Sequence, residues 1–175
     1  MKPPLRNGSL DDYQTPASAL AILLPHLKKD WVIWECAEGE GYLSEALRKE
    51  GFEVVTTDIH QGYDFLKFQP EDFDIIVTNP PYSLKDKFLR RAYELGKPFA
   101  FLLPLTTLEG RARQAMFASH GISLLIPDRR TNFITPDGKG CGSWFLTAWF
   151  TWQLLEKDLV FQSCIQQMHE VIVGG

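Results

Sequence analysis

Short apolar runs alternate with amphipathic stretches of about a dozen residues, and this alternation constrains the fold more than any other feature of the sequence. Each apolar run has the length of a strand, and each amphipathic stretch repeats its apolar residues at helical spacing. We expect strands over residues 31–35, 52–57, 73–78, 99–103 and 122–126, and helices over 42–50, 83–95 and 109–119. Strands separated by helices pair in parallel through right-handed crossovers. The sequence therefore predicts an α/β fold, a doubly wound and mostly parallel sheet with helices on both faces.

The beginning of the chain differs from this regular pattern. Residues 1–12 are polar, contain prolines and a glycine, and lack apolar periodicity, which predicts an extended N-terminal arm. Thr15 followed by Pro16 is typical of a helix start, because the hydroxyl can cap the helix and proline suits its first position. The apolar residues that follow predict a helix that ends near Lys28.

The end of the chain is also distinct. Residues 143–152 are apolar and aromatic and follow a glycine-rich loop, which predicts a closing strand antiparallel to the strand at 122–126. Residues 156–175 show little pattern and are expected to form a C-terminal tail. One domain over residues 13–155 is therefore expected between the arm and the tail.

Composition excludes several classes of protein. The net charge is −4, so the protein is not a uniformly basic nucleic-acid binder, and any phosphate contact must use a local patch. The three cysteines lack the spacing of a zinc site or a disulfide framework, which favours a reducing compartment and predicts no bound metal. No apolar run approaches the roughly 18 residues that a membrane helix needs. We expect a cytoplasmic protein with no membrane contact.

Polar residues and glycines gather where the predicted strands end. Glu35 ends the first strand, Gly39 and Gly41 follow it, Asp58 ends the second strand, and Asn79 ends the third. Ligands of doubly wound sheets bind beyond the carboxyl ends of the strands, and an acid after the second strand can accept both hydroxyls of a ribose. The acids beside the glycines, Glu38 and Glu40, would oppose a pyrophosphate. A cationic or neutral nucleoside is therefore the expected ligand, although an isolated glycine pair is also typical of a plain tight turn.

The sharpest local feature is the run Asn79-Pro80-Pro81-Tyr82, directly after an expected strand. Two consecutive prolines stiffen the chain and leave carbonyl acceptors without neighbouring backbone donors. The turn can therefore present a fixed set of acceptors to an amine, and Tyr82 can offer a flat face on which a planar group stacks. A strand-ending proline turn with a packing tyrosine is the alternative interpretation.

With these residues, the sequence resembles the class I S-adenosylmethionine-dependent methyltransferases that carry an (D/N/S)PP(Y/F/W) motif and methylate amino groups. The most similar group is the adenine-N6 DNA methyltransferases, in particular small phage-type orphan enzymes. The resemblance implies a Rossmann-like, mostly parallel seven-stranded sheet with an antiparallel last strand, and S-adenosylmethionine as cofactor. It implies catalytic roles for Asn79, Pro80, Pro81 and Tyr82. It implies cofactor contacts for Tyr13, Thr15, Pro16, Glu35, Cys36, Ala37, Gly39, Gly41, Asp58, Ile59, Asp64, Phe65 and Asn79.

The chemistry that the resemblance implies follows from the target amine. The lone pair of an adenine exocyclic amine is delocalised into the ring, so the site must localise it. The Asn79 side-chain oxygen and the Pro80 carbonyl can accept the two amine hydrogens and stabilise the positive charge that develops on nitrogen. Tyr82 would stack on the base, which in duplex DNA must first be flipped out of the helix.

Several residues are candidates for binding a target. Arg129 and Arg130 open a basic loop beside the expected site, and Phe133 or Trp144 could contact a base. The segment 85–113 is also basic, although a solvated helix face explains it equally well. We expect DNA as the partner, with sequence recognition by a homodimer or a separate protein. RNA adenine, a protein glutamine amide, and a non-catalytic role in cofactor binding remain the alternatives.

Overall fold

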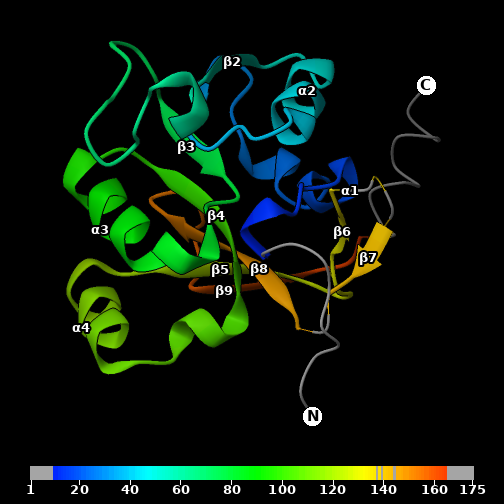
Figure 1. The fold of residues 1–175 in the computed structure, drawn as a ribbon. Coiled ribbons are helices and arrows are strands. Elements are labelled where there is room, and N and C mark those ends of the chain that lie inside the picture. Colours follow the sequence, from blue (N-terminus) through cyan, green and yellow to red (C-terminus); the bar gives the residue numbers. More distant parts are fainter. Residues whose placement is uncertain (1–9, 137, 139, 144, 165–175) are drawn as a thin grey trace.

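The computed structural model describes residues 10–136, 138, 140–143 and 145–164. A seven-stranded sheet in the order β2-β1-β3-β4-β8-β5-β9 forms the centre (Figure 1). Its strands are β1 (Val32–Glu35), β2 (Glu53–Thr56), β3 (Ile75–Thr78), β4 (Phe99–Pro104), β5 (Ser123–Pro127), β8 (Thr147–Trp152) and β9 (Leu159–Gln162). All pair in parallel except β8, which is antiparallel to β4 and β5. The predicted Rossmann-like, mostly parallel sheet is confirmed.

Helices cover both faces of the sheet because alternate residues of each strand point to opposite sides. On one face, α1 (Ala17–Leu20) and α2 (Tyr42–Lys49) pack on a core that includes Ile33 and Trp149. On the other, α3 (Lys85–Leu95) and α4 (Arg111–His120) pack on an aromatic core around Phe101 and Phe150. All four residues of β3 are buried, as expected for a central strand covered on both sides.

A two-stranded antiparallel sheet stands apart from the central one. It consists of β6 (Asn132–Ile134) and β7 (Gly140–Gly142), and it interrupts the connection between β5 and β8. In Figure 1 this hairpin lies beside α1, away from α3 and α4. Its strand β6 is joined to the N-terminal segment through an isolated bridge between Gln14 and Ile134.

Short 3₁₀ turns lead the chain out of several strands. They are η1 (Leu10–Asp12), η2 (Leu24–His26), η3 (Ile59–Gln61), η4 (Tyr82–Leu84) and η5 (Leu105–Leu108). Three of them follow the carboxyl ends of β2, β3 and β4. No helix in the described part of the chain is long and apolar enough to cross a membrane.

The N-terminal predictions need two corrections. Residues 10–12 form η1 rather than an extended arm, because Asp11 accepts hydrogen bonds from the backbone and side chain of Ser83; residues 1–9 lie outside the described part. The long helix expected from Thr15 is only α1. Pro16 occupies the cap position and no side chain caps the helix, while Pro25, which has no backbone N–H, lies inside the separate turn η2.

The segment expected to be a tail contributes a strand of the central sheet. β9 pairs in parallel with β5 and follows the antiparallel β8, so β8 is not the last strand. Asp128, just after β5, accepts hydrogen bonds from the Ser163 hydroxyl (2.6 Å) and the Cys164 amide (3.2 Å). These bonds hold the end of β9 against β5 and lower the pKa of the Asp128 carboxyl to about 2.

We predict that Trp149→Phe destabilises the fold strongly. Trp149 is fully buried, and its indole N–H donates to the Ala19 carbonyl at 2.9 Å, so the change leaves a void and an unpaired carbonyl. A loss of about 2–4 kcal/mol is expected in urea unfolding. Trp152→Phe is the matched control, because Trp152 is only half-buried; an equal loss in both variants would contradict the prediction.

Candidate active site

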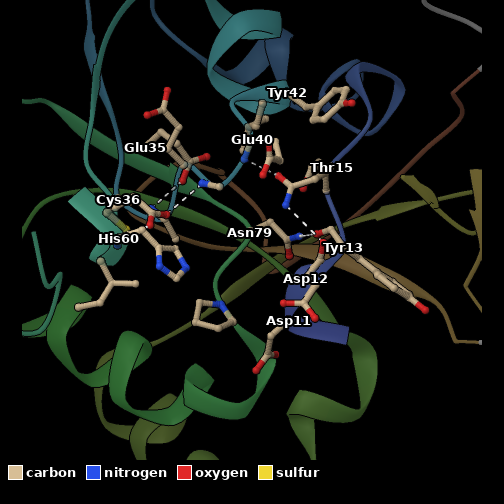
Figure 2. Close-up of a pocket in the computed structure, with 18 of the residues that line it drawn as sticks. Asp11, Asp12, Tyr13, Thr15, Glu35, Cys36, Glu40, Tyr42, His60 and Asn79 are labelled. Carbon is tan, nitrogen blue, oxygen red and sulfur yellow. Dashed lines mark hydrogen bonds between the residues drawn. The ribbon is translucent and has the colours of Figure 1, made fainter. Parts of the chain in front are cut away.

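A cavity of about 1080 Å³ lies at the carboxyl ends of β1, β2 and β3, where doubly wound sheets bind their ligands. Figure 2 shows Cys36 and His60 on one side of it, Tyr13 and Asp12 on the other, and Asn79 between them. The predicted cofactor residues that line it are Tyr13, Thr15, Glu35, Cys36, Ala37, Gly39, Asp58, Ile59, Asp64, Phe65 and Asn79. Pro81 also lines it, whereas Pro16, Gly41, Pro80 and Tyr82 do not.

The β1–α2 loop (residues 36–41) depends on two glycines in the left-handed backbone region. Gly41 has a φ of 83° and precedes α2, where its carbonyl accepts from the Glu45 amide. Gly39 has a φ of 56°, and its amide donates to Asp58 Oδ2 at 3.0 Å. A side chain at either position would be strained. Gly41 therefore starts the helix, while Gly39 shapes the wall of the cavity.

Asp58 fixes the loop that follows β2. Besides the Gly39 amide, its carboxylate accepts a hydrogen bond from the His60 amide at 2.8 Å, through Oδ1. Each carboxylate oxygen has a second lone pair, so both can still accept a hydrogen bond from a ligand hydroxyl. The carboxylate is thereby held rigidly at the cavity wall with acceptor capacity to spare.

Glu35 is buried at the base of the cavity. Its side chain accepts hydrogen bonds from the Thr78 hydroxyl and from the Ala37 amide, the latter at 3.0 Å. Burial raises the pKa of Glu35 to about 8, against these hydrogen bonds, which lower it. Burial likewise raises the pKa of the neighbouring Cys36 thiol, so this cysteine is not an activated nucleophile.

The cavity is acidic. Seven of its lining residues are acids, namely Asp11, Asp12, Glu35, Glu38, Glu40, Asp58 and Asp64, and none of the described lining residues is a lysine or arginine. Clustered carboxylates attract cations and repel phosphates. The site therefore suits a positively charged ligand and opposes a dinucleotide pyrophosphate, as the acids beside the glycines predicted.

Asn79 places an unusual acceptor in this cavity. Its Nδ2 lies 3.5 Å from the Tyr13 carbonyl, in donor geometry, whereas its Oδ1 is buried and none of the described residues donates to it. A buried polar atom without a partner costs about 1–3 kcal/mol, so such atoms are uncommon in folded proteins. Asn79 thus lines the cavity and carries a buried acceptor to which no described residue donates.

Tyr82 is turned away from the cavity. Its ring packs edge-on against Phe145, with centroids 6.2 Å apart, and its hydroxyl is buried with no partner among the described residues. This burial raises the pKa of the phenol. The stacking surface that the motif predicts is therefore not presented to the cavity in this conformation.

The predicted target residues are spread widely. Arg129 and Arg130 are exposed after the carboxyl end of β5, outside the cavity. Phe133 is only 2% exposed and packs in the same core cluster as Tyr13, so its ring does not present a surface to a base in this structure. Trp144 lies outside the described residues.

Sequence reasoning missed several residues that line the cavity. Gln14 lies within the Tyr13-Gln14-Thr15-Pro16 segment, but its role depends on contacts far along the chain. Tyr42, Tyr63 and Leu84 line the cavity with more than a third of their surface exposed, as Ile59 does. Exposed apolar side chains at a cavity mark a binding site, a signal that only the structure supplies. The hairpin contributes Thr135, Pro136 and Gly138.

We predict that Glu35 makes the protein less stable as pH rises. The unfolded chain loses this proton near pH 4.5 and the folded chain near 8, so between these values the folded state holds one more proton. The free energy of unfolding should therefore fall by about 1.4 kcal/mol per pH unit from this group. Urea unfolding at pH 5.5, 6.5 and 7.5 should show that Glu35→Gln removes the slope. Glu45→Gln, an exposed control on α2, should keep it; an unchanged slope in Glu35→Gln would refute the prediction.

No protein-family model matches the chain, and no curated protein matches it. Several solved structures, in contrast, are similar to the chain. A "putative RNA methyltransferase" from Pyrococcus horikoshii superposes with a TM-score of 0.58 at 16% identity, over 86% of this chain and 91% of that one.

Two further structures share the fold. The modification subunit of a "putative type I restriction enzyme" from Vibrio vulnificus has a TM-score of 0.53 at 12% identity, over 90% of this chain and 48% of its own. A dimethyladenosine transferase from Plasmodium falciparum has a TM-score of 0.51 at 13% identity, over 79% of this chain and 61% of its own. At these identities the comparisons show that the chain shares its fold with these three proteins.

Proposed function

We propose that the protein is an S-adenosylmethionine-dependent methyltransferase that methylates the exocyclic N6 amine of adenine in DNA. The observation that carries the proposal is the unpartnered Asn79 Oδ1, buried beside an acidic cavity at the carboxyl edge of the sheet. An amine is a ligand that can donate to this oxygen. The shared fold with solved methyltransferases supports the same conclusion.

The cavity fits the proposed cofactor. A sulfonium and an ammonium are both cations, which suits the six acidic side chains that line the cavity besides the protonated Glu35. Asp58 can accept the ribose hydroxyls with its remaining lone pairs, and Ile59, 61% exposed, offers an apolar surface to the adenine. Asp64, whose Oδ1 already accepts from the Leu66 amide at 3.0 Å, can accept from the adenine amine. When bound, S-adenosylmethionine supplies an activated methyl group.

Asn79 and Pro80 supply the acceptors for the target amine. Hydrogen bonds to the Asn79 Oδ1 and the Pro80 carbonyl localise the nitrogen lone pair. The new N–C bond forms as the sulfonium S–C bond breaks, and one amine proton is then lost to water. Both oxygens stabilise the positive charge that develops on nitrogen. Tyr82 stacks on the base after turning away from Phe145, a move that its unpartnered hydroxyl makes less costly.

The polymer contact must lie outside the acidic cavity. Arg129 and Arg130 are exposed at the same edge of the sheet and can meet the phosphates that flank a flipped base. Among the described elements, only the β6–β7 hairpin stands outside the central fold. We therefore propose that a second copy of the chain or a separate protein supplies sequence recognition.

The decisive experiment measures transfer of labelled methyl from S-adenosylmethionine to unmethylated DNA, total RNA and a protein extract in parallel. We expect N6-methyladenine in the nucleosides digested from DNA. Label in RNA adenine or in glutamine would overturn DNA as the substrate. Cofactor binding without any transfer would favour a binding role instead.

Asn79→Ala should lower kcat about 100- to 1000-fold, because it removes an acceptor for charge that develops in the transition state. The affinity for S-adenosylmethionine, measured by calorimetry, should stay within about threefold. Gln69→Ala, which removes an exposed amide elsewhere, is the control. A variant that keeps wild-type kcat would refute the proposed role of Asn79.

The double variant Arg129→Ala/Arg130→Ala should weaken DNA binding and reduce its salt dependence. Each lost phosphate contact lowers the slope of log K against log salt by about 0.9, so a decrease of about 1.8 is expected. The control is Lys28→Ala/Lys157→Ala, which removes two exposed charges at the opposite edge of the sheet. Equal salt slopes in the two double variants would show that Arg129 and Arg130 do not contact the DNA phosphates.

A further inference from the structure

Gln14 lies between the β1–α2 loop and the β6–β7 hairpin and contacts both. Its backbone amide donates to the Ile134 carbonyl at 2.8 Å, and its carbonyl accepts from the Ile134 amide at 3.0 Å. Its side-chain Oε1 accepts from the Glu40 amide at 3.0 Å, and its Nε2 lies 3.4 Å from the Asp12 carbonyl. One residue thus joins two segments that are about a hundred positions apart in the sequence.

The side-chain contact with the loop is close. A Cβ added to Gly39 would lie 2.7 Å from Gln14 Oε1 and 3.0 Å from Nε2, which is tighter than real carbon contacts allow. The amide of Gln14 therefore lies directly against the loop backbone. Because Gly39 also donates to Asp58, the contact reaches the residue proposed to hold the ribose.

The hairpin forms the other end of this connection. It is a separate two-stranded sheet, seated by the buried Phe133, and its tip contributes Thr135, Pro136 and Gly138 to the cavity. A shift of the Gln14 backbone would move β6 with it, since both main-chain bonds of the bridge would have to follow. The same backbone continues to Tyr13, whose carbonyl lies within reach of Asn79 Nδ2.

We propose that Gln14 is a positioning residue that couples the β1–α2 loop to the hairpin, so that a ligand ordering the loop also orders the hairpin. The coupling rests on the proposed function, because it takes S-adenosylmethionine as the ligand of the loop. By linkage, a target that orders the hairpin then strengthens cofactor binding by the same factor.

The test is amide hydrogen exchange of the hairpin in the full chain, with and without saturating S-adenosylmethionine. Gln14→Met keeps the size of the side chain and both main-chain bonds but loses the acceptor for the Glu40 amide. Gln61→Met is the matched control: its amide also contacts the loop, at Glu38 Oε2 (3.4 Å), but does not contact the hairpin. Melting temperatures of both variants establish that they are folded.

We expect the cofactor to slow hairpin exchange about fivefold in the wild type and in Gln61→Met, and to leave it unchanged in Gln14→Met. Hairpin protection that persists in Gln14→Met, or that is missing in the wild type although calorimetry shows binding, overturns the coupling alone. No binding to the wild type overturns the coupling and the proposed cofactor together. If Gln14→Met does not fold, Gln14→Leu replaces it, because leucine also lacks the acceptor for the Glu40 amide; persistent protection there overturns the coupling.

Discussion

The buried hydrogen bond from the Thr78 hydroxyl to the Glu35 side chain links two walls of the candidate site. It joins the last residue of β1 to the last residue of β3, and each of these strands leads directly into a wall of the cavity. Because the contact lies at the base, it fixes the distance between the β1–α2 loop and Asn79. A carboxyl kept away from water is costly on its own, and its pKa of about 8 reflects that cost. Parallel pairing brings these strand ends to one edge, and this hydrogen bond sets their relative position.

The central sheet could be predicted from sequence because its strands carry their own signal. Ile75–Thr78 is apolar throughout and buried on both faces, so its pattern alone indicates a central strand. β9 carries no such signal, since its residues are alternately exposed and half-buried and its position depends on pairing with β5. The helix expected from Thr15 to near Lys28 is longer than the observed α1. The start signal at Thr15 and Pro16 is local, whereas Pro25, inside the same apolar run, interrupts the helix.

The candidate site was predictable to the extent that its residues follow strand ends. Asp58 and Asn79 were placed by that rule, and both line the cavity. Side-chain orientation was not predictable in the same way. Tyr82 lies where the motif puts it in the chain, yet its ring packs against Phe145 because a large aromatic side chain is stabilised by burial. Gln14 was missed because its partners, Glu40 and Ile134, are distant in sequence and no local pattern connects them.

The acidic lining of the cavity affects how strongly the reactant and the product of the proposed reaction are bound. The bound cofactor carries a sulfonium charge before transfer, and its thioether product carries none at sulfur. Carboxylates that attract the reactant therefore lose much of that attraction once the methyl group has left. In the proposed reaction, the acidic cavity therefore binds the sulfonium reactant more strongly than the thioether product. This difference in charge favours replacement of the product by fresh reactant in that reaction.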